Sequence, residues 1–441
     1  MPAALPIIAP DADRVIDELP VAQPPLRIAV VTETYPPEIN GVAMSIHRIV
    51  EGLRGRGHAL QLLRPRQQPG DAAGVATGFQ EVLMRGLPIP RYPDLKLGLP
   101  ARRALLALWR ARRPDVVHIA TEGPLGWSAL QAACVLRLPV TSDFRTNFHA
   151  YSRHYGIGWL SRPILAYLRK FHNQTATTMV PTQALADELA HCGLRHLRVV
   201  GRGVDAARFD PARRSLALRQ AWGVGPQTLV VACVGRLAPE KNLGLLLRAF
   251  AAIRATRPDS RLLLVGDGPA RAELQAACPD ALMAGRRSGD DLAAHYASAD
   301  LFLFPSLTET FGNVTPEAMA SGLPVLAFDH AAAGQLIRDG ANGRLAPLGD
   351  SAAFVRLAQA LARDAPGAQA LGRQARETAL AHGWAHIVGQ VEAILRQAQG
   401  MAAEPTAALA AAGSSRCHSA AVPLSQAGIS ILDHAHRRQP R

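Results

Sequence analysis

Short apolar runs alternate with amphipathic segments along the first half of the chain. Runs of four to six apolar residues predict strands, and the longer segments with helical periodicity predict helices between several of them. The expected strands are 26–31, 59–63, 81–84, 115–119, 139–143, 177–181 and 197–201, and the expected helices include 43–56, 101–113 and 183–191. Such alternation predicts a parallel sheet with helices on both faces.

The same pattern restarts near residue 228. Strands are expected at 228–235, 261–269, 281–285, 300–304 and 324–328, with helices at 241–257 and 270–277. The segment 206–227 is interpreted as a link between the two series. We therefore expect an α/β protein with two Rossmann-like domains, 26–206 and 207–383, rather than a short-period repeat.

The two ends of the chain differ from these domains. Residues 1–25 are rich in proline and acidic residues and are expected to form a disordered leader. Residues 384–400 carry apolar side chains at helical spacing and predict a helix with one apolar face. The remainder, 401–441, is rich in small residues, ends in a basic cluster, and is expected to be a low-complexity tail.

Composition narrows the class of protein. The 441 residues are 48% hydrophobic and 19% charged, which is typical of a globular chain of two or three domains. No apolar run approaches the roughly 18 residues of a membrane span. The N-terminus lacks the basic region of a secretory signal, and the five cysteines are scattered without metal-ligand spacing. We expect a cytoplasmic protein with reduced cysteines and no bound metal.

The formal net charge of +13 indicates an anionic partner. Nucleic acid is one interpretation, but no recognition-helix pattern or interleaved aromatic pattern accompanies the charge. An anionic membrane surface or an anionic substrate suits the sequence better. Only three of the 48 basic residues are lysines, so Lys241 is an unusual choice where it stands.

Two carboxylates, Glu309 and Glu317, lie eight positions apart across an expected strand-to-helix junction. Pro316 favours a helix start there, and a helix start presents unpaired N–H groups that attract anions. The backbone N–H groups in question belong to Phe311, Gly312, Asn313 and Val314. Two unrelated surface acids would be the plain alternative. Acids beside an anion site suit a ligand with phosphates and hydroxyls, such as a nucleotide sugar.

Two cations follow another expected strand. Arg236 comes directly after the strand 228–235, and Lys241 follows five positions later. Ligands of open α/β sheets bind beyond the carboxyl ends of the strands, so both cations are expected to face the same crevice as the acids. A guanidinium can fork onto two phosphate oxygens, whereas an ammonium acts as a point charge. A solvated basic surface is the alternative.

With these motifs, the chain resembles the retaining glycosyltransferases of GT-B fold, family 4. Their E-x7-E element and R-x4-K pair match Glu309/Glu317 and Arg236/Lys241, and the resemblance covers roughly 26–400. It implies two Rossmann-like domains facing across a cleft, with the C-terminal helix crossing back to the N-terminal domain. It also implies that Arg236 and Lys241 bind the donor diphosphate, that Glu309 holds the transferred sugar, and that Glu317 holds the ribose.

The same resemblance suggests residues of the N-terminal domain. The stretch PPEINGV (36–42) is similar to the family's glycine loop, and only Gly41 of the usual glycine pair is present. His118 and His149 follow expected strands and would contact the donor sugar, with His149 the more direct contact. The second histidine of the family's DVVHxH pattern is replaced here by Ala120. Structural histidines and an ordinary Asn-Gly turn are the alternatives.

The stretch 143–156 most resembles GDP-mannose-dependent mannosyltransferases and sulfolipid-synthase-like enzymes. GDP-mannose is therefore the favoured donor, with a UDP-hexose as the second choice, and a lipid or glycan is the expected acceptor. The basic, aromatic stretch 149–173 could contact an anionic lipid surface or simply pack as a helix with a solvated side. No nucleic-acid partner and no cofactor are expected.

The resemblance also shapes the expected mechanism. The segment GDD (289–291) reads as a helix start rather than a metal motif, so Arg236, Lys241 and backbone dipoles would stabilise the leaving group. Retention of configuration could involve Glu309 as a nucleophile or, as we favour, attack on the same face of the sugar. Sugar-nucleotide epimerases, glycan phosphorylases and non-catalytic nucleotide-sugar binders of the same fold remain alternatives.

Overall fold

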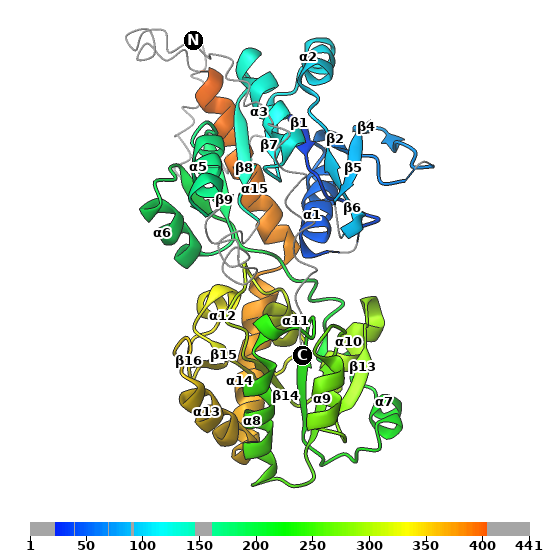
Figure 1. The fold of residues 1–441 in the computed structure, drawn as a ribbon, viewed down its shortest axis with the longest axis vertical. Coiled ribbons are helices and arrows are strands. Elements are labelled where there is room, and N and C mark those ends of the chain that lie inside the picture. Colours follow the sequence, from blue (N-terminus) through cyan, green and yellow to red (C-terminus); the bar gives the residue numbers. More distant parts are fainter. Residues whose placement is uncertain (1–22, 39, 69, 90–91, 146–160, 404–441) are drawn as a thin grey trace, which may run out of the picture. The chain divides into compact units, whose positions relative to one another are not determined.

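A computed structural model describes residues 23–38, 40–68, 70–89, 92–145 and 161–403 (Figure 1). The first half of the chain forms an eight-stranded sheet in the order β10-β9-β8-β7-β1-β2-β4-β3. Its strands are β1 (Arg27–Val31), β2 (Ala59–Pro65), β3 (Val75–Ala76), β4 (Phe79–Met84), β7 (Val116–Ile119), β8 (Val140–Asp143), β9 (Thr177–Val180) and β10 (Leu197–Val199). All neighbours are parallel except β3 and β4.

Helices cover both faces of this first sheet because successive strand residues point to opposite sides. In β1, Ile28 and Val30 belong to the cluster that contains α1, whereas Ala29 and Val31 belong to the cluster that contains α2 and α3. The helices of this half are α1 (Gly41–Gly55), α2 (Arg102–Ala111), α3 (Pro124–Val135), α5 (Ser161–His172) and α6 (Gln183–His191). Both faces are thus apolar and buried, as an all-parallel region requires.

The antiparallel hairpin of β5 (Gly86–Ile89) and β6 (Tyr92–Gly98) was not expected from the sequence. This segment contains three prolines and two glycines, which mask a strand pattern. Helix α3 was also missed, whereas the helix considered within 149–173 is present as α5. The strands that were expected from apolar runs are all present, with ends that shift by one to four residues.

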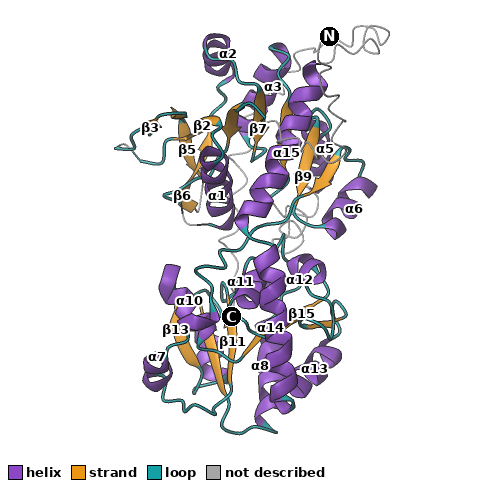
Figure 2. Ribbon diagram, turned by 180° about the vertical axis from the view of Figure 1, so that it is seen from behind, coloured by secondary structure: helices purple, strands orange, loops and turns teal. Residues whose placement is uncertain are grey.

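The second half forms a six-stranded parallel sheet in the order β13-β12-β11-β14-β15-β16 (Figure 2). Its strands are β11 (Val230–Val234), β12 (Arg261–Val265), β13 (Leu282–Gly285), β14 (Leu301–Phe304), β15 (Val325–Phe328) and β16 (Arg344–Ala346). In β11, Val230, Ala232 and Val234 pack into one core, and Val231 and Cys233 pack into the other. This sheet is therefore also covered on both faces.

Nine helices accompany the second half in the described residues, and two single 3₁₀ turns precede two of them. The α-helices are α7 (Leu216–Ala221), α8 (Leu243–Arg254), α9 (Arg271–Ala277), α10 (Gly289–Ala297), α11 (Val314–Ala320), α12 (Ala331–Leu336), α13 (Ser351–Arg363), α14 (Ala365–Ala381) and α15 (Trp384–Ala403), and the turns are η2 (Pro211–Arg213) and η3 (Pro239–Lys241). The expected helix at 241–257 begins two residues later, because Asn242 has a left-handed conformation with φ of 54°.

The last helix, α15, returns to the core of the first sheet, as expected. Its apolar face, which includes Val388 and Val391, packs in one cluster with α1 and β1. A Cβ atom at Gly52 of α1 would lie 2.4 Å from Cγ2 of Val388, so the two helices approach closely at a residue without a side chain. The apolar stripe of α15 is therefore satisfied by the N-terminal half of the chain.

The expected leader lies mostly, and the expected tail almost entirely, outside the described residues. Within the ranges that the structure describes, no helix is both long enough and apolar enough to cross a bilayer.

Candidate functional site

The loop between β14 and α11 carries the first carboxylate. Strand β14 ends at Phe304, and α11 begins at Val314 with Glu317 in its first turn. Gly312 has a φ of 88°, a conformation that side chains rarely adopt, and it lets the loop turn tightly against Glu309. Within the described residues, the backbone N–H groups of 311–314 donate no hydrogen bond. The sequence analysis expected these four groups to face an anionic ligand, and their binding of the donor stays a prediction.

Lys241 meets Glu309 at this loop. Strands β11 and β14 are neighbours in the sheet, so the segments that follow their carboxyl ends lie side by side. The ammonium of Lys241 donates to Oε1 of Glu309, and the hydroxyl of Ser306 donates to the same oxygen over 2.7 Å. Both charged side chains are mostly buried, with 19% and 14% of their surface exposed. Within the part of the chain described, Oε2 of Glu309 accepts no hydrogen bond.

Arg236 lies near Lys241 in the chain but has a different partner. Its guanidinium pairs with Glu240 in the 3₁₀ turn that follows, and the Arg236 side chain is about half exposed. The expected cationic pair is therefore present after β11, with each member held by its own carboxylate. Binding of a phosphate by Arg236 stays a prediction.

The second carboxylate, Glu317, faces an aromatic hydroxyl. Tyr296 of α10 is fully buried, and its hydroxyl donates to Oε2 of Glu317 over 3.0 Å. Burial raises the pKa of Glu317 from 4.5 to about 7, although the hydrogen bond from Tyr296 opposes the shift. Tyr296 was not singled out in the sequence; its place on the helix before β14 was the available signal. Contact of Glu317 with a ribose stays a prediction.

The Glu317→Gln variant should be more stable than the wild type at pH 8 and equally stable at pH 4. A carboxyl whose pKa is higher in the folded state contributes stability below pH 4.5, and this contribution is lost as the pH rises to about 7. We expect the melting temperature to rise by about 2–4 °C at pH 8. Thermal unfolding of both proteins from pH 4 to 8 measures it; parallel curves would contradict the shift. Glu33 and Glu122 titrate in both proteins and cancel in the comparison.

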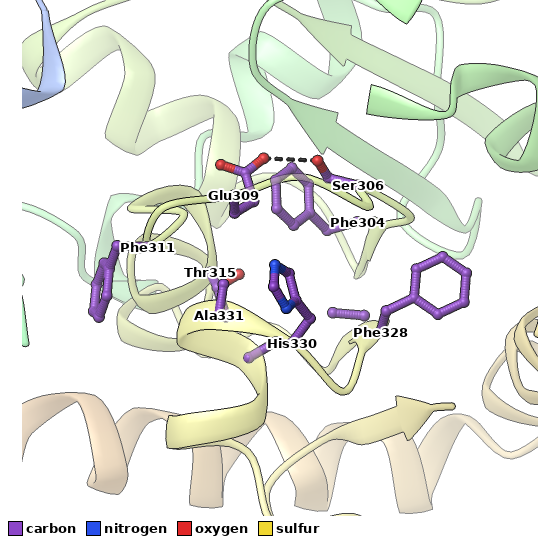
Figure 3. Close-up of a pocket in the computed structure, with 10 residues that line it drawn as sticks. Phe304, Ser306, Glu309, Phe311, Thr315, Phe328, His330 and Ala331 are labelled. Atoms are coloured by element: carbon purple, nitrogen blue, oxygen red, sulfur yellow. Dashed lines mark hydrogen bonds between the residues drawn. The ribbon is translucent and has the colours of Figure 1, made fainter. Parts of the chain in front are cut away.

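A small cavity opens beside the Glu309 loop (Figure 3). Its volume of about 10 Å³ is enough for roughly one water molecule. Polar groups of Ser306, Glu309, Thr315 and His330 line it together with apolar side chains. His330 follows the carboxyl end of β15. The sequence analysis expected ligand contacts beyond the carboxyl ends of strands, as for Arg236, but it did not consider His330.

In the N-terminal half, His118 has a buried position. Only 2% of its surface is exposed, and its ring nitrogens lie 3.0 Å from the Thr141 hydroxyl and 3.3 Å from the Asp143 carboxylate. Burial alone would raise the pKa of Asp143, but the positive charge of Arg145 and the proximity of His118 lower it to about 2. Both nitrogens of His118 are thus engaged in the core, which favours a structural histidine over a sugar contact. His149 lies outside the described residues.

Gly41 opens α1 rather than forming an ordinary turn. The side chain of Asn40 caps the helix by accepting from the N–H groups of Val42 and Ala43. A Cβ atom at Gly41 would lie 3.5 Å from Nδ2 of Asn313 and 3.7 Å from Nη1 of Arg202. Gly41 and the Glu309–Val314 loop are therefore close to each other, and contact of Gly41 with a donor phosphate stays a prediction.

Buried acids lie at the carboxyl ends of the N-terminal strands. Glu33, after β1, accepts hydrogen bonds from the N–H groups of Gly98 and Leu125. The second of these bonds satisfies a free N–H group in the first turn of α3. Burial raises the pKa of Glu33 to about 7 and that of Glu122 to about 8. Both oxygens of Glu122 lack a hydrogen-bond partner among the described residues. Neither acid was singled out from the sequence.

Two family models match this chain. One, described as "Glycosyltransferase Family 4", covers residues 39–208, and the other, "Glycosyl transferases group 1", covers residues 228–364. The two matches correspond to the two sheets.

Relatives that are named as transferases match over most of the chain. A GDP-mannose-dependent alpha-mannosyltransferase of Mycobacterium tuberculosis is 36% identical over 84% of this chain and 97% of its own length. The corresponding protein of Corynebacterium glutamicum is 34% identical over 73% of this chain and 76% of its own. A sulfoquinovosyl transferase of Arabidopsis thaliana is 29% identical over 82% and 71%, respectively.

Solved structures share the fold. HepE of Anabaena, in complex with UDP and glucose, superposes with a TM-score of 0.65 at 19% identity and covers 84% of this chain and 100% of its own. Sucrose-phosphate synthase of Thermosynechococcus elongatus superposes with a TM-score of 0.68 at 18% identity over 85% and 100%. These likenesses confirm the expected GT-B architecture.

Proposed function

Because this chain belongs to the group 1 glycosyltransferases of family 4, we propose that it transfers mannose from GDP-mannose to a lipid or glycan acceptor with retention of configuration. The observation that carries the proposal is the meeting of Lys241 and Glu309 beside four N–H groups that have no partner among the described residues. Mannose and GDP are supported by three relatives of 34–36% identity that are named GDP-mannose-dependent alpha-mannosyltransferases.

Lys241 and Arg236 are proposed to bind the diphosphate, with the N–H groups of 311–314 nearby. An ammonium has three N–H bonds, and Glu309 uses one of them, so two remain for phosphate oxygens. Oε2 of Glu309, which accepts no hydrogen bond from the described residues, is suited to accept hydrogen bonds from sugar hydroxyls. Glu317 is proposed to hold the ribose with the carboxyl that Tyr296 supports.

In the proposed step, the bond between C1 of the sugar and the β-phosphate oxygen breaks while the acceptor oxygen attacks C1 from the same face. The acceptor proton passes to the departing phosphate. Two donors already engage Oε1 of Glu309, which reduces its strength as a nucleophile and supports same-face attack over a covalent intermediate.

The proposal includes independence from metal ions. Lys241, Arg236 and the backbone N–H groups supply positive charge where a divalent ion would otherwise stabilise the leaving diphosphate. The segment 289–291 forms the start of α10, and Asp290 lies 3.4 Å from Arg208 and 3.5 Å from Arg213. These ion pairs give Asp290 a structural use.

A panel of donors tests the proposal. Purified protein should bind GDP-mannose more tightly than UDP-glucose or UDP-galactose in calorimetry, and should release GDP when a lipid extract is added. Excess EDTA should leave the rate within about twofold of the untreated protein. Preference for a UDP-hexose would replace the donor, binding without nucleotide release would indicate a binding protein, and complete loss with EDTA would contradict metal independence.

We also propose that the protein works at the cytoplasmic face of an anionic membrane. Arg162, Arg169 and Lys170 are exposed on α5, and two relatives of 26–28% identity are named alpha-monoglucosyldiacylglycerol synthases. Basic residues near a surface attract anionic lipids by about 1 kcal/mol each. Co-sedimentation with phosphatidylglycerol vesicles but not with phosphatidylcholine vesicles tests this; equal binding to both would contradict it.

A further inference from the structure

Arg202 lies in the segment that connects the two sheets, and its side chain reaches the loop before α11. Its Nη1 atom lies 3.4 Å from Oδ1 of Asn313, and its guanidinium carbon lies 5.8 Å from the ring centre of Phe311. The same Nη1 is 3.7 Å from the position of a Cβ atom on Gly41. Arg202 therefore contacts three residues that the donor site is proposed to include, although it belongs to no motif found in the sequence.

The hydrogen bonds of this guanidinium are incomplete. Its Nε atom is buried and lacks a partner, and the 3.4 Å contact with Asn313 is its single hydrogen bond to the described residues. No carboxylate in the described ranges lies within 4.0 Å of it. An arginine has five N–H donors, so Arg202 retains most of its donor capacity.

Elsewhere in the described residues, buried arginines form ion pairs with acidic residues. Arg64, with 4% of its side chain exposed, pairs with Asp71 and Glu81. Arg219, with 2% exposed, pairs with Asp300 and also donates to three backbone carbonyls. A buried cation without an anion is costly, because water no longer solvates it. Arg202 is partly buried, with its Nε atom fully buried, and it departs from the pattern that the same chain follows at these two sites.

The electrostatic surroundings of Arg202 explain why an anion is suited to this position. Burial, followed by the positive charge of Arg145, lowers the pKa of Arg202 to about 9, while Asp143 and Glu309 act in the opposite direction. Asp143 already pairs with Arg145, and Glu309 already pairs with Lys241. The positive charge of this region is therefore compensated only in part by its own acids.

We propose that Arg202 is a third cation of the donor site and that it binds the diphosphate of the nucleotide sugar. A guanidinium can donate two parallel hydrogen bonds to two oxygens of a phosphate group. Its present neighbours, the amide of Asn313 and the ring of Phe311, do not offer such a pair of anionic oxygens. The inference rests on the proposed function, because a diphosphate must bind beside Lys241 for Arg202 to reach it.

Calorimetry that compares the binding of GDP with that of guanosine tests the role of Arg202. If the panel of donors shows a preference for UDP-sugars, UDP and uridine replace them. The Arg202→Gln variant should bind GDP about 10- to 100-fold more weakly than the wild type, the loss expected for a hydrogen bond to a charged group. Its affinity for guanosine should be unchanged, since the nucleoside has no phosphate. The Arg356→Gln variant removes the same charge from an exposed position on α13 and should bind GDP as the wild type does.

Arg202→Lys provides a second variant, which keeps the positive charge but loses the planar group that can donate two parallel hydrogen bonds. It should weaken GDP binding by less than Arg202→Gln does. Should Arg202→Gln not fold, weaker GDP binding with normal guanosine binding in Arg202→Lys would carry the assignment. Equal losses for GDP and guanosine would mean that Arg202 only braces the Phe311–Asn313 loop. Unchanged GDP binding with a raised KM for the acceptor would assign the anion to the acceptor. A wild type that binds no nucleoside diphosphate would instead refute the proposed function.

Discussion

Lys241→Ala should reduce transfer by about 100- to 1,000-fold, the range seen when one preorganised donor to a developing negative charge is removed. The variant loses the ammonium that is proposed to bind the diphosphate. It also leaves Glu309, with only 14% of its side chain exposed, without its cation, so that the remaining negative charge repels the donor. Steady-state kcat/KM for GDP-mannose measures the effect, and we expect both the affinity for GDP and kcat to fall.

A matched variant separates this loss from a loss of folding. Arg248→Ala removes one positive charge from an exposed position of α8, the helix that begins shortly after Lys241. It should keep full activity, and both variants should show the circular dichroism spectrum of the wild type. Full turnover by Lys241→Ala would show that the diphosphate binds elsewhere.

Glu309→Gln should have opposite effects on nucleotide binding and on transfer. The amide keeps the size of the side chain and can still accept a hydrogen bond from Ser306. It no longer neutralises Lys241, so GDP should bind up to about fivefold more tightly, a change of about 1 kcal/mol at the upper end of the range for ion pairs that water still reaches. Transfer should fall by at least about 100-fold, because the carboxylate that holds the sugar is lost.

Calorimetry of GDP and steady-state assays of the same preparation measure both effects. The Lys241→Ala/Glu309→Gln double variant should bind GDP no better than Lys241→Ala, because the gain depends on a released ammonium. Weaker GDP binding by Glu309→Gln would mean that Glu309 does not compete with the diphosphate. Detection of a covalent hexosyl adduct on Glu309 by mass spectrometry would contradict same-face attack.

Much of the fold was predictable because its signals are local. Strands such as β11 and β14 are uninterrupted apolar runs, and buried parallel strands have this pattern irrespective of their neighbours. The β5–β6 hairpin was missed because prolines and glycines conceal its period. The stripe of apolar residues on α15 was also legible, since helical spacing depends only on the sequence itself.

The candidate site was predictable in its residue types but not in its pairings. Arg236, Lys241, Glu309 and Glu317 were selected by their positions after expected strands and by their resemblance to the family's two motifs. Their partners Glu240, Ser306 and Tyr296 were not foreseen. The structure shows the ring nitrogens of His118 beside Thr141 and Asp143, and contact of His118 with a sugar stays a prediction. A histidine after a strand has the same sequence signature in either place.

Local sequence was enough to predict most of the strands and helices and the charged residues at their ends, because both depend on neighbours within a few residues. Only the tertiary structure decided that Lys241 meets Glu309, 68 residues away, since this requires β11 to pair with β14 in the sheet. Packing likewise leaves Arg202 without an acid among the described residues, while Arg64 and Arg219 have theirs. Compensation of a buried charge depends on residues brought together by packing, and no local pattern encodes it.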